Sequence, residues 1–139
     1  MNTSEKQCRT LHFIDIENLG ESTILVEDQV RLVKEEYLKI VSPKMGDQFV
    51  LGVSHFNLSA TSFGWGAGKA KYVVQSGENG AELALLKVLE DRQLINRFDR
   101  ILIGSGDGIF AEIASSLRRS GLSVSFVARN HSVSYGIYR

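Results

Sequence analysis

The sequence has little cysteine or proline, and its positive and negative charges balance. Cys8 is the only cysteine among 139 residues, so the chain can form neither an internal disulfide nor a zinc site built from several thiolates. Its 16 basic and 16 acidic residues give no net charge. That balance argues against binding nucleic acid by bulk positive charge, but not against a local basic surface. No apolar run reaches the roughly 18 residues of a transmembrane helix, so none is expected.

The start of the chain also lacks an apolar segment. Residues 1–10 are polar, so no signal peptide is visible, and with the single cysteine this predicts a reducing, cytoplasmic location. Hydrophobic residues make up 43% of the chain, which is enough for a core, and the length suits one domain. We expect residues 1–9 to be a flexible lead-in and residues 10–139 to form a single domain.

Apolar runs of strand length alternate along the chain with segments of helical periodicity. The expected strands are Thr10–Ile16, Gln48–Ser54, Ala70–Gln75, Phe98–Ser105 and Leu122–Ala128, with a possible sixth at Tyr135–Tyr138. The expected helices are Glu27–Val41, Asn79–Arg92 and Asp107–Ser120. Several strands are apolar on both faces, which is typical of a parallel sheet covered by helices on both sides. The sequence therefore predicts a three-layer α/β/α domain with a mostly parallel sheet, whose ligands bind at the carboxyl ends of the strands.

Three carboxylates stand at the expected ends of strands or starts of helices. Asp15 interrupts an apolar run, and burying an unpaired carboxylate costs several kcal/mol. Each acid also has a simpler explanation: Asp15 could accept backbone N–H groups in a turn, Glu82 could form a capping box with Asn79, and Asp107 could cap the helix that follows it.

Taken together, Asp15, Glu82 and Asp107 indicate a metal site. All three are expected at one edge of the sheet, where they would repel one another, and a divalent cation with hard oxygen ligands, such as Mg²⁺, relieves that repulsion. Such an ion can activate a water molecule and neutralise charge on a phosphate. The pattern therefore favours metal-assisted phosphodiester hydrolysis, and Asp15 with Glu17 leaves a phosphatase as another candidate.

The order of these motifs resembles the NYN domains of the PIN-like nuclease superfamily, most closely small stand-alone bacterial members. The matching pieces are a hydrophobic strand ending in Asp15 with Asn18 three residues on, the helix start Gly80–Leu85, and the run Ile101–Asp107 leading to Phe110. The resemblance spans about Leu11 to Val127. It implies a five-stranded parallel sheet in the order 3-2-1-4-5 and a ribonuclease site that depends on Mg²⁺ or Mn²⁺.

Residue by residue, Asp15, Glu82 and Asp107 match the acidic positions of that family, and Asn18 matches its polar residue in the first loop. Two positions depart from the pattern: the helix-start acid is commonly Asp where this chain has Glu82, and many members have a second acid where this chain has Ile109. The departures leave open one metal ion instead of two, weaker metal binding, or a degenerate domain that binds RNA, a nucleotide or a protein without cleavage. Glu17, Glu78 and Glu112 are candidates for the missing ligand.

A basic rim for RNA is expected near the carboxyl terminus, because the residues from Ile113 onward contain four arginines and no acid. The candidate RNA contacts are Arg129, His131, Lys69, Trp65 and Tyr135. Trp65 could instead fill the core or cover a dimer surface, and Tyr135 could pack on an edge strand. We therefore expect a metal-dependent endoribonuclease acting on single-stranded or structured RNA; a homodimer and a regulatory protein partner remain open.

Overall fold

The fold is built on a central sheet whose first five strands are parallel. The computed structural model describes residues 9–66, 68, 70–129 and 135–138, the last four by their backbone only. The strands are β1 (Thr10–Asp15), β2 (Gln48–Val53), β3 (Ala70–Val74), β4 (Arg100–Gly104), β5 (Ser123–Arg129) and β6 (Tyr135–Tyr138). Their order is β3-β2-β1-β4-β5-β6, and β6 pairs antiparallel with β5. The predicted α/β class and the sheet order 3-2-1-4-5 are confirmed.

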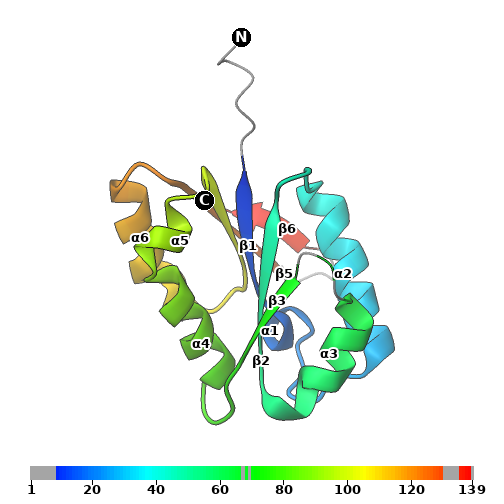
Figure 1. Cartoon of the computed structure of the whole chain (residues 1–139). Coiled ribbons are helices and arrows are strands. Elements are labelled where there is room, and N and C mark those ends of the chain that lie inside the picture. The colour runs from blue at the N-terminus through cyan, green and yellow to red at the C-terminus, as the bar shows by residue number, and fades with distance from the viewer. Residues whose placement is uncertain (1–8, 67, 69, 130–134, 139) are drawn as a thin grey trace.

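Helices cover both faces of this sheet. One face carries α4 (Gly80–Leu89), α5 (Arg92–Ile95) and α6 (Ala111–Arg119), and the other carries α2 (Glu27–Val41) and α3 (Leu58–Trp65) (Figure 1). Three short elements follow strand ends: α1 (Ile16–Leu19), and the 3₁₀ turns η2 (His55–Asn57) and η3 (Gly108–Phe110). None of the helices in the described part of the chain has the length and apolar character needed to cross a membrane.

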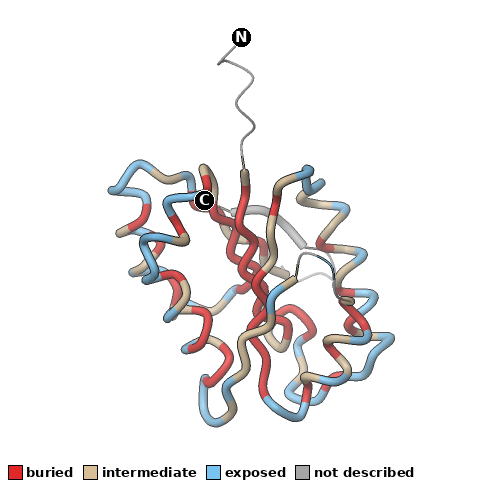
Figure 2. Tube along the Cα trace, in the orientation of Figure 1, coloured by how far each residue is buried: buried red, intermediate tan, exposed pale blue. Residues whose placement is uncertain are grey.

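The core is divided by the sheet into two clusters, because successive side chains of a strand point to opposite faces. From β1, Leu11 and Phe13 pack with α4, α5 and α6, whereas Ile14 packs with α2 and α3. Every residue of β1 is buried, and the buried trace runs through the centre of the molecule (Figure 2). Asp15 therefore ends the most enclosed strand of the sheet.

Two predicted helices differ from the structure at their ends. The helix expected over Asn79–Arg92 ends at Leu89, because the Asp91 side chain accepts hydrogen bonds from the N–H groups of Gln93 and Leu94 and starts the separate helix α5. The helix expected from Asp107 begins as the 3₁₀ turn η3 before α6. Helix α1 was not predicted.

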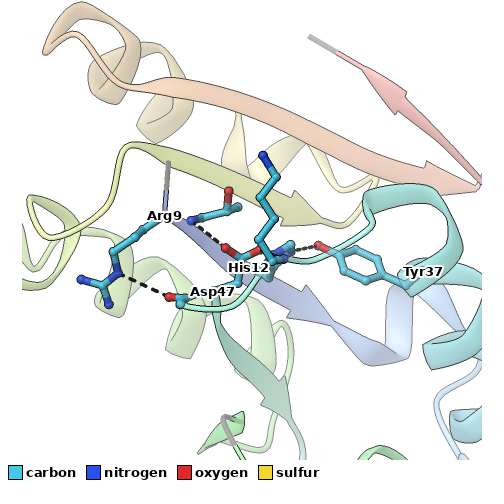
Figure 3. Close-up of polar contacts among 7 residues, drawn as sticks. Arg9, His12, Tyr37 and Asp47 are labelled. Atoms are coloured by element: carbon cyan, nitrogen blue, oxygen red, sulfur yellow. Dashed lines mark hydrogen bonds and ion pairs between the residues drawn. The ribbon is translucent and has the colours of Figure 1, made fainter. Parts of the chain in front are cut away.

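A buried polar network lies at the amino end of the sheet, opposite the predicted site. His12 is 1% exposed and lies between Tyr37 and Asp47 (Figure 3), with Nδ1 2.7 Å from the Tyr37 hydroxyl and Nε2 2.9 Å from Asp47 Oδ2. Burial lowers the pKa of His12, although Asp47 opposes the shift, so the neutral ring accepts from Tyr37 and donates to Asp47. His12 is therefore a core histidine that takes no part in the predicted site.

The expected lead-in lies almost wholly outside the described residues, which begin at Arg9. Arg9 itself is held in place. Its N–H donates to Asp99 Oδ2 at 2.9 Å, and its guanidinium lies 4.7 Å from the centre of the Phe98 ring. Arg9 is therefore packed against the residues that precede β4.

Candidate functional site

A cleft of about 1010 Å³ opens at the carboxyl edge of the sheet. It is lined by residues that follow the ends of β1, β2, β3 and β4, by the end of β5, and by the start of α4. Its lining includes Glu17, Asn18, Glu21, Ser54, Phe56, Glu78, Asn79, Glu82, Gly106 and Arg129. The cleft is where ligands bind in open parallel sheets.

Asp15 is not a lining residue of the cleft, but it is buried next to Asn18, which is one, and it has one carboxylate oxygen unpaired. Its Oδ2 accepts a hydrogen bond of 3.0 Å from Ser105 Oγ, and the carboxylate also accepts from the Asn18 N–H. Its Oδ1 has no hydrogen-bond partner, and Asp15 has no exposed surface. The alternative, an Asp in a turn that accepts hydrogen bonds from backbone N–H groups, accounts for the contact with Asn18 but not for the unpaired Oδ1.

The surroundings of Asp15 favour its protonated form. Burial is the largest cause and the negative charge of Glu82 is the second, and together they raise the pKa of Asp15 to about 7. The Ser105 hydrogen bond lowers the pKa but does not offset them, and the charge of Glu17 raises it further. A bound cation would reverse this effect by stabilising the ionised carboxylate.

Glu82 lines the cleft from the first turn of α4 and does not belong to a capping box. Asn79 precedes the helix in a left-handed conformation, with φ at 58°, and its side chain makes no capping hydrogen bond. The capping interpretation of Glu82 is therefore wrong. Gly52, which pairs with Asp15 across the sheet, allows α4 to approach: a Cβ there would lie 2.8 Å from the Ala81 carbonyl oxygen.

Asp107 does not join Asp15 and Glu82 in a three-carboxylate cluster. Its Oδ1 accepts from the Ile109 N–H at 3.1 Å, so the carboxylate caps η3, and it is absent from the cleft lining. Among the described residues, no group of three or more His, Cys, Asp or Glu side chains is arranged to hold a metal ion. The expected three-acid cluster is thus not formed. Ser105 links the two acids instead, donating to Asp15 and accepting from the Asp107 N–H at 3.1 Å.

Asn18 lies on the cleft, as expected, and fixes the loop beside it. Its Oδ1 accepts a hydrogen bond of 2.9 Å from the Gly106 N–H, which ties the turn after β1 to the loop after β4. The side chain therefore positions the backbone next to Ser105, the residue that holds Asp15.

Glu17 is the best-anchored carboxylate of the cleft. Its Oε2 accepts from the Ser54 N–H at 3.1 Å, the Ser54 hydroxyl at 2.5 Å and Asn57 Nδ2 at 2.6 Å. The sequence marks Glu17 only as a candidate for the missing ligand. Ser54, Asn57 and Ser105 were missed, because single polar residues after strands carry no recognisable pattern.

The predicted RNA contacts have different outcomes. Arg129 lines the cleft and forms an ion pair of 3.1 Å with Glu21. Trp65 is 3% exposed and packs in the core beside Tyr37 and Phe49, so its proposed RNA contact is wrong and its core alternative is confirmed. Lys69 and His131 lie outside the described residues. Tyr135 begins β6, opposite Arg129.

The donor set fits a cation held by two carboxylates and water. Asp15 has an unpaired oxygen and Glu82 is close enough to raise its pKa, and Mg²⁺ often binds through one or two carboxylates while keeping several waters. Among the described residues, the charged ones in the lining are Glu17, Glu21, Glu78 and Glu82, against Arg129. This excess of negative charge also favours a cation.

Comparisons of the chain with protein-family models, with curated proteins and with solved structures give no match.

Proposed function

We propose that the protein is a metal-dependent ribonuclease that hydrolyses phosphodiester bonds of RNA, as the resemblance to NYN domains implies. One observation carries the proposal: the buried Asp15 carboxylate has an unpaired oxygen and feels the charges of Glu82 and Glu17, two residues that line a large cleft. A purely structural carboxylate would have both oxygens satisfied, because unpaired buried charge is costly.

Asp15 and Glu82 are the residues that would hold Mg²⁺ or Mn²⁺. When bound, such an ion lowers the pKa of a coordinated water and neutralises charge on a phosphate oxygen. Mg²⁺ and Mn²⁺ are both compatible with carboxylate and water ligands.

The other residues of the cleft orient these carboxylates and the substrate. Ser105 occupies Asp15 Oδ2 and so leaves Oδ1 for a ligand. The three hydrogen bonds to Glu17 Oε2 fix that carboxylate at the wall. Arg129 supplies a positive charge at the cleft for a phosphate of the bound strand.

The test is cleavage of a labelled single-stranded RNA with Mn²⁺ or Mg²⁺. We expect Asp15→Asn and Glu82→Gln each to lower the cleavage rate by roughly 10- to 100-fold or more. Loss of a residue that only supports a metal ligand already has an effect of that size. Glu90→Gln is the control, because Glu90 is an exposed residue at the other end of α4. Equal rates for wild type and Asp15→Asn would show that the site is misassigned.

A domain that binds RNA without cutting it is the second candidate, favoured by the capping role of Asp107 and by Ile109 in place of an acid. Thermal unfolding separates the two. Stabilisation by Mn²⁺ that Asp15→Asn abolishes supports the metal site, whereas RNA binding with no stabilisation and no cleavage supports the degenerate domain.

A further inference from the structure

Phe56 is an exposed aromatic side chain on the wall of the cleft. It is 72% exposed and is the one aromatic among the described lining residues. Isolated exposed apolar side chains are common on protein surfaces, so exposure alone assigns no role. The position of Phe56 and the way its turn is held both indicate one.

The η2 turn presents Phe56 from a backbone fixed on both sides. On one side, His55 N lies 2.9 Å and His55 Nδ1 2.7 Å from Ser76 Oγ. On the other, Asn57 Nδ2 donates to Glu17 Oε2 at 2.6 Å and to the Thr23 carbonyl at 3.0 Å, and Asn57 has no exposed surface. A fixed turn that leaves its central aromatic ring in solvent is preorganised for a ligand, because little order is lost on binding.

The same contacts connect Phe56 to the acidic centre. Glu17 accepts a hydrogen bond from Asn57, the residue after Phe56, and its charge acts on Asp15. Phe56 therefore lines the same cleft as Glu82 and stands next in the chain to the residue that holds Glu17.

We propose that Phe56 is a stacking platform for an unpaired base, which makes single-stranded RNA the substrate of this cleft. The inference rests on the proposed ribonuclease function and specifies its substrate class. Every nucleobase has a π face, so an exposed phenyl ring binds unpaired bases of any sequence. Bases inside a duplex are stacked on each other and offer no face, so a duplex lacks this contact.

Phe63 provides a matched control. It is 71% exposed, almost the same as Phe56, and belongs to α3, which directly follows η2, but it does not line the cleft. Phe56→Ala and Phe63→Ala therefore remove the same side chain from two equally exposed positions, of which only one belongs to the cleft.

The experiment measures binding of a fluorescent single-stranded RNA by anisotropy. Ca²⁺ replaces Mg²⁺, and the RNA is recovered afterwards and checked for intactness. We expect Phe56→Ala to weaken binding roughly 5- to 100-fold, the usual effect of losing one stacked base, and Phe56→Trp to retain it. We expect Phe63→Ala to bind like wild type, and all three variants to keep the wild-type melting temperature, since both side chains are exposed.

RNAs with one abasic position supply a second measurement. A purely structural contribution of Phe56 would not make its effect depend on the presence of one base. In wild type, one abasic position should weaken binding by the same factor as Phe56→Ala, and in Phe56→Ala that position should have no further effect. The stacking role of Phe56 is contradicted if wild type and Phe56→Ala bind RNA equally well, or if both Ala variants lose the same affinity. If wild type still cleaves RNA, that result leaves the proposed function intact. If wild type neither binds nor cleaves RNA, both proposals are wrong.

Discussion

The ionisation of Asp15 opposes folding when no metal ion is present. Its pKa is about 7 in the fold and 3.8 without the protein environment, so the folded protein holds this proton more tightly than the unfolded chain. The stability that depends on the proton is fully present below pH 3.8 and is lost as the pH rises through about 7. A difference of this size corresponds to roughly 4 kcal/mol. We expect Asp15→Asn to raise the free energy of unfolding at pH 8, measured in urea with EDTA, but not at pH 4.5.

Asp28→Asn is the control for that measurement at the residue scale. The Asp28 side chain is 93% exposed, and we expect its substitution to change the free energy of unfolding by no more than about 0.5 kcal/mol at either pH. A metal-free Asp15→Asn protein less stable than wild type at pH 8 would mean that the Asp15 carboxylate is satisfied in the fold and needs no cation.

At the scale of elements, Gly52 sets the distance between β2 and the first turn of α4. A Cβ at this position would lie 2.6 Å from Leu85 Cγ and 2.8 Å from the Ala81 carbonyl oxygen. The second contact is with backbone, so the helix has to move. We expect Gly52→Ala to lower the free energy of unfolding by about 1–3 kcal/mol and to reduce cleavage at temperatures where the variant is fully folded, because Glu82 shifts with the helix.

Gly108→Ala is the control, since nothing lies within 4 Å of its Cβ position. If Gly108→Ala lost as much stability as Gly52→Ala, this explanation would be contradicted.

The elements themselves were largely predictable from the sequence, and their hydrogen-bonded partners were not. The five parallel strands appear where apolar runs predicted them, because a strand buried on both faces must be continuously apolar. Asp15 was predicted as a site residue for the same reason, because it is the one charged residue in the apolar run Thr10–Ile16. Ser105, however, lies 90 residues from Asp15 in the chain, and no local pattern pairs them. The failed capping box has a local cause, the left-handed backbone of Asn79, which the residue type permits but does not require.

At the scale of the whole molecule, the net charge is zero although one cleft is acidic. Glu17, Glu21, Glu78 and Glu82 line it, and Arg129, the one cation among its described lining residues, already pairs with Glu21. RNA is a polyanion, so we expect it to bind only when divalent cations offset these carboxylates. At constant ionic strength, replacing Mg²⁺ or Ca²⁺ by EDTA should weaken binding of a single-stranded RNA roughly fivefold or more, since one interaction between charges in water is worth about 1 kcal/mol.

Charge variants test whether the cleft itself causes that requirement. Glu78→Gln should strengthen RNA binding in EDTA, because it removes one repulsive charge from the lining. Glu90→Gln changes the net charge of the protein equally but lies outside the lining, so we expect it to leave binding in EDTA nearly unchanged, measured by anisotropy at two salt concentrations. If both variants bind alike, the repulsion comes from the overall charge of the protein. If RNA binds equally well in Mg²⁺ and EDTA, the strand lies on another surface, because four carboxylates facing a phosphate backbone without a cation cannot favour its approach.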